Sequence, residues 1–266
     1  MANYCWNMEG RVARISIAPV KSLGLVHPEG VDLVRGGARG DRRFWLVDED
    51  RRLYNLKRNG SMLRIRPQWD EATQRLALDF PNGARVEGLV ELGEDVVVEL
   101  YGEPHPSRRV IGPWAAAIGE HVGQPLTLLW SENQAPDRGA WGGDVSIVSR
   151  GSLERLREEA GVDENVDGRR FRMMFEIDGI AAHAEDDWIG TRVRVGSAEV
   201  LVKGDVGRCV VTTCNPDTGV SDLDTLGTLA RYRREGRFEP LPLGAQGPVV
   251  APGRVNVGDP VGLASS

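Results

Sequence analysis

The sequence predicts a mainly β protein made of two β-barrel domains with a few peripheral helices. Short stretches rich in Val, Ile, Leu and aromatic residues recur at regular spacing, and only three segments show a helical pattern. The chain contains 33 glycines, whereas average usage of about 7% would give roughly 19, and this excess favours turns and short strands. Many short strands with few helices are typical of β-barrels.

Composition and charge exclude several classes of protein. With 41% hydrophobic and 27% charged residues, the 266-residue chain is expected to be globular, with one large domain or two small ones. A net charge of −6 gives no reason to expect a nucleic acid partner. No apolar run approaches the roughly 18 residues of a membrane helix, and the first residues lack the features of a signal peptide. We therefore expect a cytoplasmic protein with a small-molecule partner and no membrane partner.

The first half of the chain is predicted to form short strands joined by tight turns. Strands are expected at residues 12–17, 44–47, 76–80, 84–86 and 96–100. The third and fourth of these form the clearest hairpin, because alternate apolar residues fall on one face at period two. The Asn82-Gly83 pair between them is a strong turn signal.

Helices are few and are expected at residues 114–122, 153–160 and 222–236. Ser152 is the expected N-cap of the second helix, and Gly123 and Gly161 stand where the first two helices should end. Further strands are expected at residues 193–195, 198–202, 210–211 and 254–257.

The loosest polar stretch of the chain places the domain boundary. Residues 131–143 contain Pro136, Gly139 and two further glycines, without apolar periodicity. We therefore expect an N-terminal domain of residues 1–127 and a C-terminal domain of residues 128–266, each a β-barrel.

Three cysteines are too few for a disulfide framework in a chain of this size. If residues 210–213 continue as a strand, the alpha carbons of Cys209 and Cys214 lie roughly 16 Å apart. A disulfide requires less than about 7 Å. Unless a turn intervenes, both thiols should stay free.

Residues 207–219 are the segment most suited to chemistry. Cys209 follows Arg208, and a nearby cation lowers the pKa of a thiol because it favours the thiolate. Thr212 and Thr213 would present their hydroxyls on opposite faces of an extended chain. From the residues alone, the alternative is that Cys209 is a small buried apolar side chain.

This segment resembles the signature of the MOSC domain, named for the C-terminal domain of molybdenum cofactor sulfurase. The pattern Arg-Cys-x-x-Thr-Thr-x-Asp-Pro-x-Thr-Gly is matched from residue 208 to residue 219, except that Asn215 replaces the usual aspartate. Three further stretches resemble the Ala-Glu-Asp-x-Trp motif, the helix and the closing strand of the family; they are residues 184–190, 228–233 and 257–261.

The first half resembles the N-terminal β-barrel domain that accompanies MOSC in the mitochondrial amidoxime-reducing component and its bacterial relatives. Residues 19–22 and 40–48 carry this resemblance. With the second half included, the resemblance extends from about residue 11 to residue 263. It implies a MOSC N-terminal barrel followed by a MOSC barrel.

The resemblance implies a molybdenum-pterin enzyme in which Cys209 is the catalytic residue and a ligand of the metal. A thiolate is a soft ligand that suits such a centre. The cofactor, molybdopterin, ends in phosphate, which Lys21, Ser22 and Arg42 would bind. Lysine supplies a point charge there and arginine a bidentate fork.

The second half supplies the remaining expected contacts. Ser149 and Ser152 match a family Ser-x-x-Ser-Leu stretch at a helix start, where anions bind readily, and Arg172 matches the arginine of the family's Phe-Arg-Pro-Asn stretch. The residues expected to bind the cofactor are Lys21, Ser22, Arg42, Ser149, Ser152, Arg172, Arg208, Thr212 and Thr213. Each has a structural alternative: the cations could be solvated surface charges, Ser152 a plain N-cap and Thr213 a strand residue.

Three departures from the family pattern lie in the second half. Met173 and Met174 replace the Pro-Asn of many relatives, which removes a polar amide. Val206 stands where some relatives have a further cysteine, and residues 243–246 match the family's Phe-Gly-x-Asn/Tyr stretch only loosely. These changes are compatible with a different substrate, a changed binding mode or loss of the cofactor.

By resemblance, the reaction is the two-electron reduction of an N-oxygenated group, such as an N-hydroxylated amidine or a hydroxylamine, with the oxygen leaving as water. The chain has no flavin, haem or iron–sulfur motif, and its four histidines lack metal-ligand spacing. A separate electron-transfer protein would therefore supply the electrons.

Two alternatives stay open, and they belong to other functional classes. One is a sulfur carrier or sulfurtransferase with a persulfide on Cys209. Some MOSC domains are fused to pyridoxal-phosphate desulfurases, but this chain contains no such domain, so a partner would supply the sulfur. The other is a non-catalytic carrier of the molybdenum cofactor.

Overall fold

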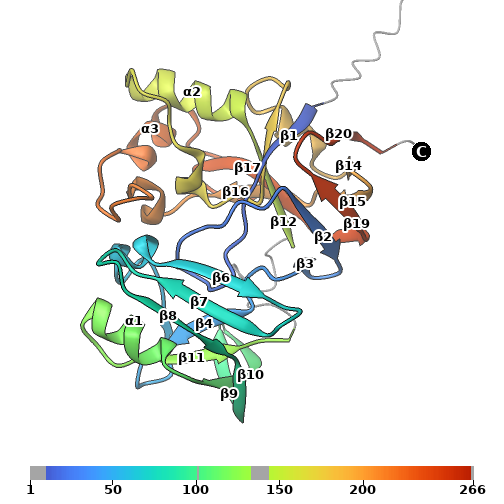
Figure 1. The fold of residues 1–266 in the computed structure, drawn as a ribbon. Helices are drawn as coiled ribbons and strands as arrows, with labels where there is room; N and C mark the ends of the chain where they lie inside the picture. The colour runs from blue at the N-terminus through green and yellow to red at the C-terminus, as the bar shows by residue number, and fades with distance from the viewer. Residues whose placement is uncertain (1–9, 101, 133–143, 265–266) are drawn as a thin grey trace, which may run out of the picture.

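The computed structural model describes residues 10–100, 102–132 and 144–264 (Figure 1). These residues form twenty strands and three α-helices, which confirms the predicted mainly β class. Figure 1 shows two lobes. The first lobe contains β4 to β11 with α1, and the second contains β1 to β3 and β12 to β20 with α2 and α3.

A nine-stranded sheet forms the second lobe, in the order β16-β17-β12-β13-β1-β20-β14-β15-β18. Its strands are β1 (Gly10–Ile15), β12 (Val145–Ser149), β13 (Phe175–Asp178), β14 (Arg192–Val195), β15 (Ala198–Leu201), β16 (Gly204–Gly207), β17 (Pro242–Gly247), β18 (Val249–Ala251) and β20 (Pro260–Leu263). Strand β1 pairs with β13 on one side and β20 on the other. Within the described residues the pairing ends at β16 and β18, so the sheet is open rather than closed into a ring.

A small sheet joins the early strands to the end of the chain. It consists of β19 (Gly253–Asn256), β2 (Gly30–Val34) and β3 (Gly37–Ala38), in that order. Val31 and Val255 lie opposite each other and are buried in the same apolar cluster as Ile15 and Phe175 of the large sheet. The N-terminal strands thus belong to the core of the second lobe.

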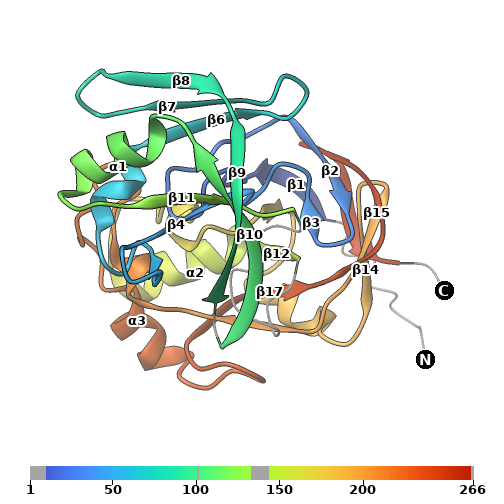
Figure 2. The same ribbon diagram turned by 90° about the horizontal axis from the view of Figure 1, so that it is seen from below.

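The first lobe contains a five-stranded and a three-stranded sheet. The first has the order β5 (Leu53–Tyr54), β4 (Phe44–Val47), β11 (Thr127–Trp130), β10 (Glu103–Ile111) and β9 (Glu91–Leu100), and the second consists of β6 (Arg66–Asp70), β7 (Arg75–Asp79) and β8 (Arg85–Leu89). Alternation along β4 sends Phe44 and Leu46 into one apolar cluster and Trp45 and Val47 into another. The long β9 and β10 cross the first lobe in Figure 2.

Two of the expected helices form as predicted at their C-terminal ends. The helices are α1 (Trp114–Val122), α2 (Arg150–Ala160) and α3 (Thr225–Tyr232). Gly123 and Gly161 end the first two in the left-handed conformation. The N-cap of α2 was wrong: Ser149, not Ser152, is the cap, and its side chain accepts the N–H of Ser152 at 2.9 Å. The third helix is shorter than predicted and is capped by Asp224.

The predicted strand at residues 210–211 is wrong. Four 3₁₀ helices lie among the described residues, η1 (Gly60–Arg64), η3 (Gly168–Phe171), η4 (Ala184–Trp188) and η5 (Val210–Thr213). In η5 the hydroxyls of Thr212 and Thr213 donate to the carbonyls of Cys209 and Val210, three residues back. Such local bonds compete with extended structure. Cys209 and Cys214 are both free thiols, although a turn does separate them.

The expected boundary between residues 127 and 128 stays a prediction. In the structure, β11 continues the first lobe to residue 130 through its pairing with β4, while β1 to β3 pair with strands of the second lobe. Most of the loose stretch at residues 131–143 lies outside the described residues. Among the described helices, none is long and apolar enough to cross a membrane.

Candidate functional site

Two segments of the chain that carry expected phosphate-binding residues lie side by side. Val20 and Phe44 form a parallel bridge, and the N–H of Lys21 donates to the carbonyl of Phe44 at 2.7 Å. The N–H of Arg42 donates to the carbonyl of Ala18 at 2.8 Å. Lys21 is buried and the Arg42 side chain is only 12% exposed. Neither cation is a solvated surface charge.

Three of the residues expected to bind the cofactor have left-handed backbone. The φ angles of Ser22, Arg42 and Arg172 are 75°, 50° and 53°. Non-glycine residues rarely adopt such angles, which cost of order 1–3 kcal/mol each and persist where the surrounding structure holds them. Four further described residues, Arg51, Gln74, His183 and Leu241, share this conformation, so it shapes the turns that carry the three expected residues and does not by itself mark a ligand site.

Asp41 is a residue of this site that the sequence motifs did not single out. Its carboxylate is buried, accepts the N–H of Ala18 at 2.7 Å and forms an ion pair with Arg42. The carboxylate therefore fixes the loop that presents Arg42 and balances part of its charge. The only sequence sign was its place beside Arg42 in a stretch rich in charge.

Strand pairing brings the Lys21 segment close to the start of β13. Ile15 lies opposite Phe175, and the N–H of Ser16 donates to the carbonyl of Met174 at 2.8 Å. The antiparallel register then leads the chain after β1 toward the end of η3, where Arg172 lies. The chain that leads from β1 to Lys21 and the segment of Arg172, two residues before Met174, therefore leave the same end of the β1–β13 pair.

The signature segment, defined from here on as residues 208–222, rests on the first lobe as well. Cys209 is the N-cap residue of η5 and is partly exposed. Val211 and Cys214, on either side of the turn, pack against the apolar cluster that contains Val20 and Phe44. The cysteine segment and the Lys21 segment thus share one apolar support, and Cys209 is not sealed in apolar packing.

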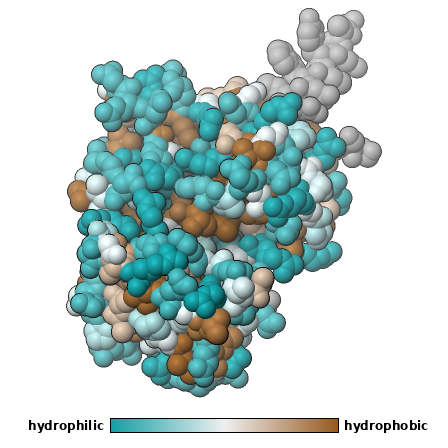
Figure 3. Space-filling view, in the orientation of Figure 1, coloured by the Kyte–Doolittle hydropathy of each residue, from teal (hydrophilic) through white to brown (hydrophobic). Residues whose placement is uncertain are grey.

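Hydrophobic surface appears in the band between the lobes (Figure 3). Val210 and Val220, which belong to the signature segment, are among the exposed large apolar side chains of the described residues. The segment that carries the Cys209 thiol therefore contains exposed apolar side chains as well as the hydrogen-bonded hydroxyls of Thr212 and Thr213.

Arg208 binds the protein itself through several contacts. Its guanidinium donates to the carbonyls of Phe171 at 3.1 Å and Leu243 at 3.0 Å, and it lies 2.8 Å from the sulfur of Met173. It also lies over the ring of Phe171. These contacts fasten the residue before Cys209 to η3 and β17.

The threonines of the signature are also engaged within the protein. Besides its bond to the Cys209 carbonyl, the Thr212 hydroxyl lies 2.7 Å from that of Thr225 at the start of α3. Thr213 accepts the hydroxyl of Ser221 at 2.9 Å. Both threonines shape the turn after Cys209, and their role in binding a cofactor stays a prediction.

The serines expected at an anion site lie in a buried network. The hydroxyl of Ser152 donates to Glu185 at 2.7 Å, and the N–H of Ser149 donates to the same carboxylate oxygen at 3.2 Å. Both serines and Glu185 are fully buried, and burial raises the pKa of Glu185. The start of α2 is therefore faced by a carboxyl group of the protein, which the sequence motifs did not reveal.

The departures from the family pattern lie in the core. Met173 and Met174 are buried in two different apolar clusters, and Val206 is buried beside Met173. Met173, at the position of the proline, also contacts Arg208, whereas Met174, which replaces the asparagine, packs in the apolar cluster of the large sheet.

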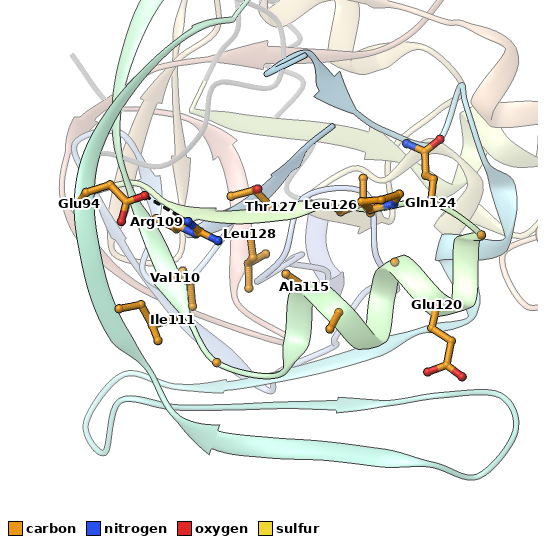
Figure 4. Close-up of a pocket in the computed structure, with 15 residues that line it drawn as sticks. Glu94, Arg109, Val110, Ile111, Ala115, Glu120, Gln124, Leu126, Thr127 and Leu128 are labelled. Atoms are coloured by element: carbon orange, nitrogen blue, oxygen red, sulfur yellow. Dashed lines mark hydrogen bonds and ion pairs between the residues drawn. The ribbon is translucent and has the colours of Figure 1, made fainter. Parts of the chain in front are cut away.

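A hollow of about 880 Å³ lies away from all of these residues. Figure 4 shows it between α1, β10 and β11, with the ion pair of Glu94 and Arg109 at one end. Apolar and small side chains line most of it, among them Val110, Ile111, Ala115, Leu126 and Leu128. None of the expected site residues lines this hollow, so we do not assign the cofactor to it.

Comparison with known proteins places the chain in a family. The MOSC domain model matches residues 136–262, and the model of the MOSC N-terminal beta barrel domain matches residues 9–98. Human mitochondrial amidoxime-reducing component 1 is 35% identical over 294 residues, which cover 96% of this chain and 83% of that protein. The mouse protein of the same name is 35% identical over a shorter match that covers 44% of this chain and 35% of that protein.

Other similarities are more distant. Molybdenum cofactor sulfurase of Anopheles gambiae is 28% identical over 257 residues, and the match spans 83% of this chain but only 32% of that longer protein. Among solved structures, the YuaD protein of Bacillus subtilis is similar with a TM-score of 0.47 and 14% identity, over 97% of each chain. From the two domain matches and the human relative, the chain belongs to the family of MOSC-domain proteins that carry an N-terminal MOSC β-barrel domain.

Proposed function

We propose that the protein is an oxidoreductase that binds the molybdenum cofactor and ligates the metal through Cys209. The observation that carries this proposal is that two segments with expected site residues pack against the same apolar cluster. The partly exposed Cys209 and the segment of Lys21 and Arg42 rest on one apolar cluster at the contact between the lobes.

The residues at this contact fit the cofactor in their chemistry. Cys209 offers one soft thiolate ligand, which suits a thiolate-rich metal centre. Lys21, Arg42 and Arg172 would supply three cations in an otherwise acidic protein, and a phosphate requires such a local concentration of charge. A Lewis-basic thiol and an anion-binding group on opposite lobes match a ligand with a metal at one end and a phosphate at the other.

Each residue has a separate part in this proposal. Lys21 and Ser22 follow β1, but Val20 and Leu23 on either side of them pack in the apolar cluster of the first lobe, as Phe44 beside Arg42 does. Lys21, Ser22 and Arg42 on the first lobe and Arg172 of the second would bind the phosphate end, and Asp41 would orient Arg42. Arg208, Thr212 and Thr213 hold the turn that presents Cys209, and Ser149 and Ser152 hold the start of α2 with Glu185.

The bound cofactor would supply two-electron redox chemistry to a small N-hydroxylated substrate. In balance, the N–O bond breaks, two electrons and two protons enter, and the oxygen leaves as water. A separate electron-transfer protein would deliver the electrons. The name of the human and mouse relatives, which describes reduction of amidoximes, supports this class of substrate.

Metal analysis tests the proposal. Protein produced in a host that makes the cofactor should contain close to one molybdenum per chain and reduce an aryl amidoxime in the presence of a chemical electron donor. Cys209→Ala should lose the metal and the activity. The matched control is Cys214→Ala, which removes the other described thiol and should retain both. Unchanged molybdenum in Cys209→Ala would reject the assignment of the ligand.

One observation favours a second candidate, a cofactor carrier without turnover. Met173 and Met174 are buried apolar residues where many relatives have Pro-Asn, so the site lacks one polar amide. A carrier would bind molybdenum through Cys209 but reduce no N-hydroxylated compound under the same conditions. A sulfur carrier would instead gain 32 Da at Cys209, roughly the mass of one sulfur atom, after incubation with a desulfurase and its cysteine substrate, because the desulfurase persulfide passes its outer sulfur to the Cys209 thiol and is left as a thiol. No observation in the fold favours this third possibility.

A further inference from the structure

Consecutive residues of η3 hold the signature segment at separate points. Arg169 donates to both carboxylate oxygens of Asp217, at 2.9 and 2.7 Å. Arg170 donates to the carbonyl of Thr213 at 3.1 Å and pairs with Asp222 at 2.6 Å. These two arginines therefore bind the protein rather than a ligand, unlike the role proposed for Arg172.

The third residue of this series holds the beginning of the segment. The carbonyl of Phe171 accepts the guanidinium of Arg208 at 3.1 Å. The segment is thus held at three places: at its start by Arg208, at the end of η5 by Thr213, and in the following loop by Asp217. Three successive residues of one short 3₁₀ helix therefore hold the segment, two through guanidinium groups and one through a backbone carbonyl.

Asp217 also contacts an arginine side chain of the first lobe. Arg66 of β6 lies 3.5 Å from the oxygen that Arg169 binds. Close beside it, a Cβ added at Gly60 would run into the carbonyl oxygen of Gly219, so the first-lobe helix η1 meets the segment backbone to backbone. Asp217 is therefore at a point where the signature segment touches both lobes.

The orientation of Arg169 is itself fixed by a second carboxylate. Its guanidinium pairs with Asp167 at 2.6 Å as well as with Asp217 at 2.7 Å. An isolated exposed pair contributes little, but a guanidinium held between two carboxylates in bidentate geometry loses less entropy per bond. The Asp217 side chain is 51% exposed, so salt should weaken the contact.

We propose that Asp217 is a positioning residue that, through Arg169 and Arg66, locks the signature segment to both lobes and thereby sets the position of Cys209 relative to the first-lobe cations. The locking of the segment stands on the contacts alone. Its effect on a bound cofactor rests on the proposed function.

The test measures the reactivity of Cys209 in protein without cofactor. Asp217→Asn should raise the rate of alkylation by iodoacetamide, followed at the Cys209 peptide by mass spectrometry, about fivefold, the factor that roughly 1 kcal/mol of local stability represents. Asp217→Glu retains the charge and should stay within about twofold of the wild type. High salt should raise the wild-type rate more than that of Asp217→Asn, since only the former has a pair to screen.

Glu87→Gln is the matched control. Glu87 also binds two arginines, Arg75 at 2.7 Å and Arg85 at 3.0 Å, but it lies on β8 away from the signature segment. Its loss should leave the alkylation rate of Cys209 unchanged. If Asp217→Asn does not fold, Arg66→Gln, at an exposed position of β6, removes the first-lobe contact alone and should raise the alkylation rate in the same direction but by less; a wild-type rate in Arg66→Gln would then contradict the contact with the first lobe. A wild-type rate in folded Asp217→Asn would overturn the proposal.

The metal content separates this proposal from the proposed function. Wild-type protein that retains no molybdenum would contradict the proposed function, while the alkylation rates would still decide whether Asp217 locks the segment. Where the wild type retains the metal, Asp217→Asn should lose it faster during dialysis and Glu87→Gln should not.

Discussion

Ser22, Arg42 and Arg172 are three of the expected cofactor-binding residues, and they share one backbone conformation. Motif matches assigned Ser22 and Arg42 to the phosphate and Arg172 to the cofactor, and all three have a left-handed backbone in the structure. The same conformation occurs at Gln74, outside the expected site, so it is a property of the backbone turn and does not depend on a ligand. The conformation at Ser22 can be tested separately from its hydroxyl.

Ser22→Gly should leave the free energy of unfolding unchanged or raise it by up to about 1 kcal/mol, since glycine adopts the angle without strain. The molybdenum content should fall, because the hydroxyl is gone. Gln74→Gly is the control, since Gln74 has a φ of 53° on an exposed turn outside the site. Urea denaturation and metal analysis give the two quantities. A destabilised Ser22→Gly that retains the metal would contradict this account.

The sequence did not reveal Asp217 or the two arginines before Phe171, because their roles are set by pairing at a distance. Arg169 and Asp217 are 48 residues apart, and Arg66 and Asp217 are 151 apart. No local spacing identifies such partners. Lys21 and Arg42 could be selected only because a family motif surrounds them.

At the scale of elements, turns and helix ends that depend on neighbouring residues were predicted correctly. The η5 turn, which depends on side-chain hydrogen bonds to the backbone, was not. The hairpin of β7 and β8 and the glycine ends of α1 and α2 follow from turn and cap chemistry within a few residues. The segment of η5 was expected to be a strand because its valines have high β propensity. The hydroxyls of Thr212 and Thr213 reverse that preference by closing the turn.

The start of α2 offers a prediction about pH. Burial raises the pKa of Glu185, so the folded protein binds this proton more tightly than the unfolded chain. The contribution is therefore fully present below the ordinary glutamate pKa, about 4.3, and is lost as the pH rises through the raised value. Glu185→Gln retains the acceptor oxygen for Ser152 and Ser149 and should reduce this loss of stability.

The measurement is the free energy of unfolding from urea titrations between about pH 4 and pH 8. Glu185→Gln should show a flatter decline across that range than the wild type. Glu235→Gln, a neutralisation at an exposed position, should show the wild-type slope. Identical slopes for all three proteins would mean that Glu185 ionises in the folded state as it does in the unfolded chain.

At the scale of the whole molecule, the order of strands in space differs from their order in the sequence. Strand β1 lies between β13 and β20 in the large sheet, although more than 150 residues separate it from β13 in the chain. Alternation patterns could indicate that residues 12–17 form a strand, but not which lobe receives it. Long-range strand pairing is therefore the part of the fold that is hardest to predict from a single sequence.

A fragment of residues 128–266 tests this arrangement. Without β1 the large sheet loses an interior strand, so the fragment should show no cooperative thermal unfolding. A chain that joins residues 10–38 to residues 128–266 through a flexible linker restores β1 to β3 and should unfold cooperatively. Cooperative unfolding of the shorter fragment would support an independent domain with the boundary expected from the sequence.

The most direct measurement of the central claim is X-ray absorption at the molybdenum edge of the loaded protein. We predict that the wild type and Cys214→Ser show the same number of sulfur neighbours around the metal. Cys209→Ser should show one fewer, or hold no metal at all. Molybdenum bound in Cys209→Ser with an unchanged number of sulfur neighbours would contradict the claim that this residue ligates the metal.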